Sequence, residues 1–235
     1  HPEFRGAALI LISQTQGTGK STFMDLISSL FGPYNTTELP MEQFLNPGQF
    51  NEFQQSLFVR IDEALAVDDL RNAQQMYNKI KTLVDPKQKE VVINAKYQGK
   101  VRVNSCSSYL IFSNHVDAVY TQPGDRRFWA GRATENPAPA NYFNSIHKRL
   151  KENDWQEHLW NYLMGVEVDV EEMYAKPPVT ETMKEVQHAT TSNLEHILDA
   201  AIAVWPTALV VPSLIKEVIH QFVGQEAISA QAARI

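Results

Sequence analysis

The sequence has one cysteine and no long apolar run. Cys106 stands alone, so a single chain can form neither an internal disulfide framework nor a four-cysteine zinc site. No apolar run approaches the roughly 20 residues that span a bilayer, and the opening HPEFRG lacks the pattern of a signal peptide. The histidines do not have metal-ligand spacing either. We therefore expect a soluble protein of a reducing compartment, the cytoplasm, without a membrane partner.

Basic residues are also in the minority. The chain has 21 Lys and Arg against 27 Asp and Glu, a net charge of -6. Its surface as a whole therefore repels nucleic acid, and any contact with DNA needs a local basic patch. Residues 79–102 contain such a patch, with seven basic residues and two acidic ones. The 43% of hydrophobic residues are enough for one sizeable domain plus a smaller appendage.

Three short apolar runs, each followed by polar residues, predict parallel strands whose carboxyl ends line a site. They span residues 7–12, 57–61 and 109–112, and a last strand is predicted at 128–130. Residues 21–31 have apolar side chains at helical spacing and predict a helix directly after the first strand. Residues 91–103 (VVINAKYQGKVRV) alternate around Gln98-Gly99 and predict a β-hairpin. The pattern indicates an α/β fold with a central parallel sheet.

The segment Asn136-Pro137-Ala138-Pro139 separates this part from a helical one, so we predict domains at 1–136 and 137–235. Apolar spacing predicts helices around Phe143 to Leu150 and around Leu159 to Leu163, and another helix begins near Thr180. The chain starts a few residues before the first strand and stops abruptly at Ile235. We therefore expect it to be a fragment of a longer protein.

A glycine-rich phosphate loop is predicted between the first strand and the first helix. Its glycines let backbone N–H groups approach phosphate oxygens, Lys20 reaches the β- and γ-phosphates of ATP, and Ser21 can ligate Mg²⁺. The full pattern has glycine where this chain has Gln14, so the motif departs at its first position only. The alternative is a glycine turn that caps a helix. The predicted nucleotide-binding residues are Gly17, Thr18, Gly19, Lys20, Ser21 and Thr22.

The ends of the other two strands offer partners for this loop. Asp62 would hold the magnesium ion through water, and Glu63 would orient and polarise the attacking water. Asn114 fits a polar sensor of the γ-phosphate or of the same water. Taken alone, an acidic pair after a strand is more often a helix cap, and the alternative for Asn114 is an ordinary turn residue.

The order GTGKST, FVRIDEA, LIFSNH and GDRRF resembles superfamily 3 helicases, most like the helicase part of phage and poxvirus primase-helicases. The resemblance covers residues 7–132. It implies an AAA+ P-loop NTPase followed by a small helical domain, a homo-oligomeric ring, usually a hexamer, and fusion to an upstream primase or polymerase. For a phage protein the site of action would be the host cytoplasm. PPVTETMKEV is similar to the helical segment after the motor in the phage group.

The same resemblance implies roles for individual residues. Asn114 would be the sensor, and the pair Arg126-Arg127 would include a finger that reaches the ATP of the neighbouring subunit, with Arg127 the first choice and Arg126 the second. The predicted hairpin would project into the ring pore and carry Lys96 at its lysine position. An exposed arginine pair without a function is the alternative for Arg126-Arg127.

The predicted hairpin also has the chemistry of a contact to single-stranded or forked DNA. Phosphate contacts need cations, and base or sugar contacts favour an aromatic side chain beside them. The candidates are Lys96, Tyr97, Lys100 and Arg102. Lysines that protect a sheet edge are the alternative.

The sequence thus predicts an ATP-dependent DNA helicase of phage or viral replication. An ATP-switched DNA-binding or loading module without processive unwinding is the second hypothesis, and a small-molecule P-loop kinase the third. The GDRRF segment and the cationic hairpin disfavour the kinase.

Overall fold

The computed structural model describes residues 6–45, 50–62, 70–85, 90–97, 99–152, 154–169, 171 and 175–190. The predicted catalytic residue Glu63 lies outside these ranges, as does the part of the predicted C-terminal domain from residue 191 on. Within the ranges, no helix combines the length and the apolar character that a membrane crossing requires.

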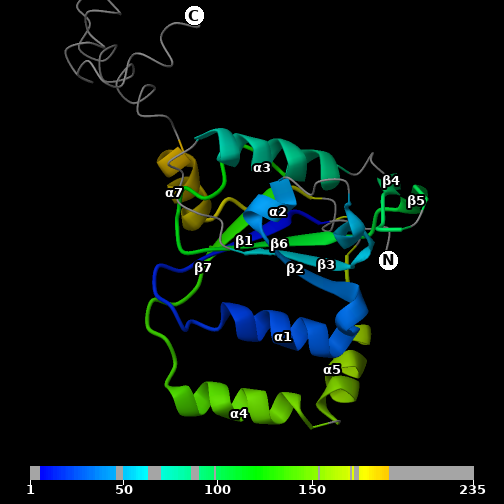
Figure 1. Ribbon diagram of the computed structural model, residues 1–235. Helices are drawn as coiled ribbons and strands as arrows, with labels where there is room; N and C mark the ends of the chain where they lie inside the picture. The colour runs from blue at the N-terminus through cyan, green and yellow to red at the C-terminus, as the bar shows by residue number, and fades with distance from the viewer. Residues whose placement is uncertain are drawn as a thin grey trace, which may run out of the picture. The chain divides into compact units, whose positions relative to one another are not determined.

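A five-stranded parallel sheet forms the centre of the fold (Figure 1). Its strands are β2 (Thr36–Pro40), β3 (Phe58–Asp62), β6 (Ser108–Ser113), β1 (Ala8–Ile12) and β7 (Phe128–Arg132), in that spatial order. Every neighbouring pair is parallel. The predicted α/β fold with a central parallel sheet is confirmed, and all four strands that the sequence predicts for this sheet are present. The assignment to the AAA+ type stays a prediction.

Helices cover both faces of this sheet, because alternate side chains of each strand point to opposite faces. On one face, α2 (Met41–Leu45), α3 (Leu70–Leu83) and α7 (Glu181–Thr190) pack against Ile10 and Ile111, which are almost fully buried. On the other, α1 (Lys20–Phe31) packs Met24 and Ile27 against Leu110 and Phe112. Figure 1 shows α4 (Ala140–Leu150) beyond α1, and α5 (Trp155–Met164) near the end of α1.

Helix α1 begins and ends at glycines that its sequence supplies. Gly19 precedes its first residue at a φ of 94°, and Gly32 follows its last at 87° with its N–H bonded to the Ser28 carbonyl. Both angles lie in the left-handed region, where a side chain is strained. The helix therefore starts directly at Lys20, at the carboxyl end of β1.

The hairpin that the sequence predicts is a separate two-stranded antiparallel sheet of β4 (Glu90–Ile93) and β5 (Val101–Asn104). Ile93 pairs with Val101, so the turn centres on Tyr97 rather than on Gln98-Gly99. Tyr97 accordingly has a positive φ of 63°. The side chain of Asn51, just before the short helix η2 (Glu52–Gln55), fixes the hairpin by bonding the Val92 carbonyl at 2.9 Å and the Asn94 N–H at 2.7 Å.

The predicted helices near residues 143, 159 and 181 are present as α4, α5 and α7. The described parts of all three fall in the same compact unit as the sheet, residues 1–190. Arg132 of β7 pairs with Glu185 of α7, and the Thr180 hydroxyl bonds the Ala130 carbonyl at the start of that helix. The division of the chain at residues 136 and 137 stays a prediction.

Candidate phosphate site

The predicted phosphate loop joins the carboxyl end of β1 to α1. Gly17 and Gly19 have φ angles of 75° and 94°, which only glycine adopts without strain. A Cβ atom at position 19 would also lie 3.0 Å from the Phe143 ring. The hydroxyl of Thr18 is buried and has no hydrogen-bond partner among the described residues. A phosphate oxygen bound at the loop would give this hydroxyl a partner.

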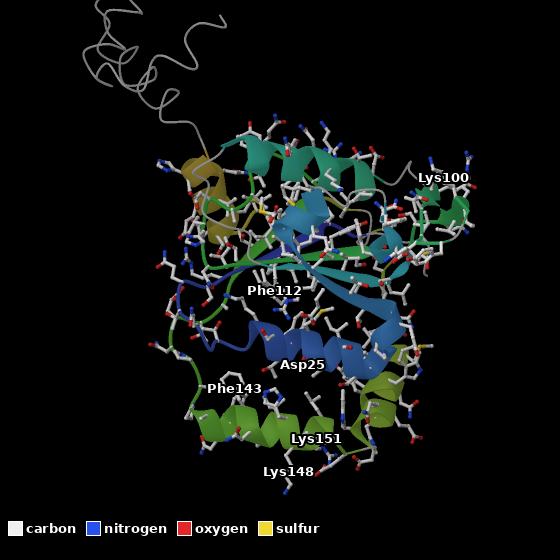
Figure 2. The ribbon with its side chains drawn as sticks, viewed as in Figure 1. Asp25, Lys100, Phe112, Phe143, Lys148 and Lys151 are labelled. Atoms are coloured by element: carbon white, nitrogen blue, oxygen red, sulfur yellow. The ribbon has the colours of Figure 1, made fainter. Side chains whose placement is uncertain are left out.

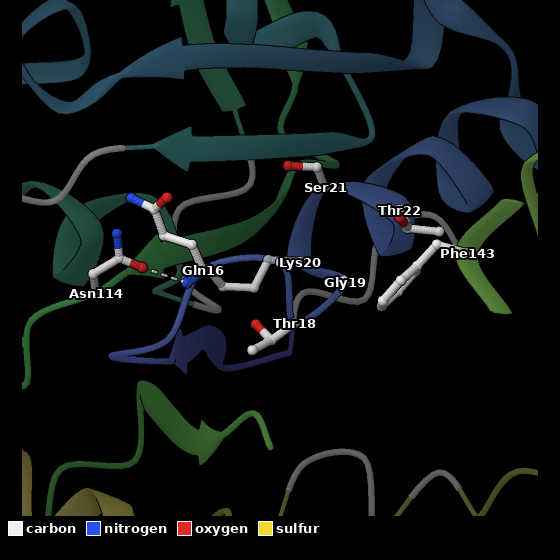
Figure 3. Close-up of a pocket in the computed structure, with 9 residues that line it drawn as sticks. Gln16, Thr18, Gly19, Lys20, Ser21, Thr22, Asn114 and Phe143 are labelled. Atoms are coloured by element: carbon white, nitrogen blue, oxygen red, sulfur yellow. Dashed lines mark hydrogen bonds between the residues drawn. The ribbon is translucent and has the colours of Figure 1, made fainter. Parts of the chain in front are cut away.

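Lys20 connects the ends of the two central strands. Its ammonium lies 2.6 Å from Asn114 Oδ1, 3.3 Å from the Ser13 carbonyl and 3.4 Å from the Ser113 carbonyl (Figure 3). Ser13 follows β1 and Ser113 ends β6, which pair in parallel. Burial lowers the pKa of Lys20, and the nearby Asp62 carboxylate opposes the shift. The structure thus brings Lys20, Asn114 and Asp62 together, as the sequence predicts.

The loop and its neighbours line a cavity of about 330 Å³. Its walls include all six predicted nucleotide-binding residues, with Asn114 on one side and Phe143 of α4 on the other (Figure 3). Phe143 was expected only to lie on the apolar face of a helix. Nothing in its spacing could distinguish a cavity wall from an ordinary packing residue, because both require an apolar side chain at the same helical position.

Asp62 and Ser21, the two predicted magnesium ligands, are joined by Arg60. The guanidinium of Arg60 forms two bonds to the Asp62 carboxylate, at 2.9 and 2.5 Å, and a third to Ser21 Oγ at 3.3 Å. These two oxygen donors suit Mg²⁺, which prefers hard oxygen ligands. Arg60 Nη2 lies between them, so a positive charge is already accommodated at this point beside the phosphate loop. Arg60 was not among the predicted site residues, although a charge inside an apolar strand run signals a partner.

The first turn of the phosphate loop is held from the far side by Glu135. Its carboxylate accepts hydrogen bonds from the Thr15 hydroxyl at 2.9 Å and from the Thr15 N–H at 3.2 Å. These bonds lower the pKa of Glu135, with the Thr15 hydroxyl the largest cause. Arg132 contacts the same carboxylate at 3.3 Å. The loop is therefore tied to the segment that follows β7.

The arginine pair lies at the opposite end of the strands, where β1 and β7 begin. The Arg127 carbonyl bonds the N–H of Ala8, at the amino end of β1. The phosphate loop begins beyond Ile12, four residues further on, or about 13 Å at the usual rise of a strand. Arg127 is partly buried, 3.4 Å from the buried carboxylate of Asp125. Arg126 is exposed, and no described residue forms a hydrogen bond or ion pair with it.

The four candidate DNA contacts all lie on the hairpin, which is also near the amino ends of the parallel strands. Tyr97 is 93% exposed, and the Lys96 ammonium lies 5.1 Å from the centre of its ring. Lys100 projects from the hairpin near its turn (Figure 2). Arg102 is exposed but pairs with Glu90 at 3.3 Å.

One member of the wider basic patch is not part of this surface. Lys79 donates hydrogen bonds to the carbonyls of Phe44 and Leu45 and lies over the Phe44 ring. Burial lowers its pKa. Lys79 therefore adds little to the exposed positive charge of the patch, because its ammonium contributes to the packing of α3 on α2.

Comparisons with known proteins give a family of unknown function and a fold. Residues 11–127 match the model of a family of unknown function, DUF5906. No curated protein matches the chain.

Among solved structures, the chain is similar to the apo C-terminal region of NrS-1, residues 305–718, with 20% identity and a TM-score of 0.67 over 91% of this chain and 54% of the other. A second structure of that region has 22% identity and a TM-score of 0.65, over 90% and 52%. JCV helicase with a bound small molecule has 13% identity over 84% of this chain and 56% of the other. Its TM-score of 0.42 is too low to establish a shared fold. The chain spans about half the length of these structures, and the likeness to NrS-1 is one of fold.

Proposed function

We propose that the chain is the ATP-driven motor domain of a DNA helicase. The observation that carries the proposal is the contact of Lys20 with Asn114 at 2.6 Å, at the joined carboxyl ends of β1 and β6 and inside the glycine loop. A cation, a polar amide and a loop of backbone N–H groups converge there on one cavity. That combination is the means by which proteins bind and cleave nucleoside triphosphates.

Each residue of the site has a chemical task in ATP hydrolysis. Lys20 contacts the transferred phosphate, and the backbone of residues 17–19 binds the phosphate oxygens. Ser21 and Asp62 hold Mg²⁺, which when bound neutralises charge on the phosphates. Asn114 orients the γ-phosphate or the attacking water. The assignment of Glu63 as the residue that polarises this water stays a prediction.

The distance between the arginine pair and the phosphate loop supports a ring. Arg126 and Arg127 lie at the amino ends of the strands. They cannot reach the loop of their own chain, which lies at the carboxyl ends. A neighbouring copy that presents its Arg126-Arg127 pair to this cavity would complete the site. We propose such a homo-oligomer, a hexamer by resemblance, and an upstream primase or polymerase in the longer protein.

The exposed hairpin supports DNA as the partner of this motor. Lys96 and Lys100 offer cations, and Tyr97 offers an exposed aromatic ring. Stacking on an aromatic ring together with phosphate contacts is how single strands are held without sequence preference. ATP turnover at the carboxyl ends of the β-strands would move the hairpin near their amino ends, and the bound DNA strand would move with it.

Replacing Lys20 with Ala tests the nucleotide site. We expect hydrolysis of ATP to fall at least ~10²-fold, because a cation at the transferring phosphate is lost. Thermal unfolding should hardly change, since Lys20 belongs to neither of the hydrophobic clusters that pack on the sheet. Lys184→Ala, which removes an exposed lysine of α7, is the control and should keep its activity. Near-normal turnover by Lys20→Ala would refute the assigned site.

Replacing Lys96 and Lys100 together with Ala tests the DNA contact. For single strands each lost phosphate contact reduces the log-log salt dependence of affinity by about 0.7, so we expect a slope shallower by about 1.4. Fluorescence anisotropy with a labelled oligonucleotide at several salt concentrations measures it. Lys148→Ala with Lys151→Ala removes two exposed charges of the α4 region (Figure 2) and should leave the slope as it was. An unchanged slope in the hairpin variant would move the DNA path elsewhere.

Mixed rings test which arginine acts across subunits. The sequence ranks Arg127 first, but the exposure of Arg126 and the pairing of Arg127 with Asp125 favour Arg126. Arg126→Ala should bind ATP normally and hydrolyse it poorly, because only its neighbour's transition state is damaged. Mixing it with Lys20→Ala should restore part of the activity, since some interfaces then combine an intact loop with an intact arginine.

The same mixture with Arg127→Ala gives the comparison. If only that variant complements Lys20→Ala, Arg127 is the trans-acting residue. Should neither mixture regain activity while the subunits demonstrably exchange, either the arginines act within their own subunit or hydrolysis needs several intact interfaces at once.

A further inference from the structure

Arg60 is a buried charge in the middle of β3. Its side chain is 9% exposed, and its guanidinium lies 5.0 Å from the centre of the Phe112 ring. Glu38 of the neighbouring strand β2 accepts a hydrogen bond from Nη1 at 3.0 Å. Asp62, two residues along on the same face of the strand, accepts from Nε and Nη2. One buried cation therefore holds two carboxylates.

The geometry of Nη2 singles out this cation. The same nitrogen lies 2.5 Å from Asp62 Oδ2 and 3.3 Å from Ser21 Oγ. It thus bridges the two side chains that are assigned to Mg²⁺, although Arg60 and Ser21 are 39 residues apart along the chain. A guanidinium cannot lose its proton in a protein, so its positive charge is permanent.

We propose that Arg60 is a positioning residue that stands in for the magnesium ion and competes with it. Arg60 holds Asp62 and Ser21 facing each other, and Mg²⁺ takes Ser21 Oγ only when Nη2 withdraws. This inference rests on the proposed function. It goes beyond it by assigning to Arg60 the control of when the metal binds.

The contacts of Arg60 make such a withdrawal feasible. The bond from Nη2 to Ser21 is the longest of the set. When Nη2 withdraws, the bonds from Nε to Asp62 and from Nη1 to Glu38 can persist. The guanidinium then keeps partners for most of its charge and remains over Phe112. Because like charges repel strongly in a weakly solvated site, Mg²⁺ alone enters poorly beside Arg60. Together with the negative phosphates of ATP it enters well, so metal and nucleotide load as a unit.

The test measures how much Mg²⁺ the protein needs to bind a fluorescent ATP analogue. Arg60→Met keeps the length of the side chain and removes its charge. We expect half-maximal binding at a roughly tenfold lower Mg²⁺ concentration than in the wild type, because the competing charge is gone. Mg²⁺ without nucleotide should also raise the melting temperature of Arg60→Met and leave that of the wild type nearly unchanged.

Two further variants separate competition from general damage. Lys79→Met removes another half-buried cation, one that packs on Phe44 away from the site, and should keep the Mg²⁺ requirement of the wild type. Adding Asp62→Asn to Arg60→Met should abolish the stabilisation by Mg²⁺ alone, because the carboxylate that would hold the ion through water is lost. A purely structural Arg60 would lower the melting temperature in all conditions without changing the response to the metal.

An unchanged or higher Mg²⁺ requirement in Arg60→Met would overturn the proposal. If that variant does not fold, Arg60→Lys decides: its ammonium cannot bond Asp62 twice and reach Ser21 as well, so the requirement should fall by a smaller factor, and no fall would again overturn it. A wild-type protein that binds no nucleotide at any Mg²⁺ concentration would instead refute the proposed function, and the role of Arg60 with it.

Discussion

The parallel pairing of β1 with β6 is the constraint on which the site depends. The register sets Ile12 beside Ser113, so the phosphate loop and Asn114 follow β1 and β6 at the same end of the sheet. Lys20 then bonds the carbonyls that end both strands as well as Asn114. Since Ile10 and Ile111 are fully buried between helices, a slip of one residue would turn each strand's apolar side chains the wrong way. The hydrophobic core therefore fixes the geometry of the polar site.

The same sheet separates the chemistry from the surfaces that would use it. The cavity lies at the carboxyl ends of the parallel strands, whereas the arginine pair and the hairpin lie at their amino ends (Figure 1). Asn51 and η2 connect the hairpin to β3. A motion caused at the phosphates must cross rigid, buried strands to reach the hairpin. In the proposed ring, rigid elements of this kind would transmit displacement with little loss.

Much of this could be predicted from the sequence, because strong local signals coincide with the elements that matter. Apolar runs with polar ends mark β1, β3 and β6, and the alternation in residues 91–103 marks the hairpin. Strand β2 escapes notice, since Leu39 is its one buried residue and an edge strand needs little apolar character. Arg60, Phe143 and Lys79 could not be assigned, because their surroundings come from segments distant in the chain. Glu63 lies outside the described residues, so its role is still only a prediction.

The most direct test of the account is the steady-state rate of ATP hydrolysis with and without single-stranded DNA. A helicase motor whose cavity and hairpin act together turns over many ATP molecules per site, and DNA increases the rate. The account predicts both results, with the increase saturating as the strand is bound. A single turnover per site that DNA does not alter would contradict it and would instead indicate a module that uses ATP only as a switch.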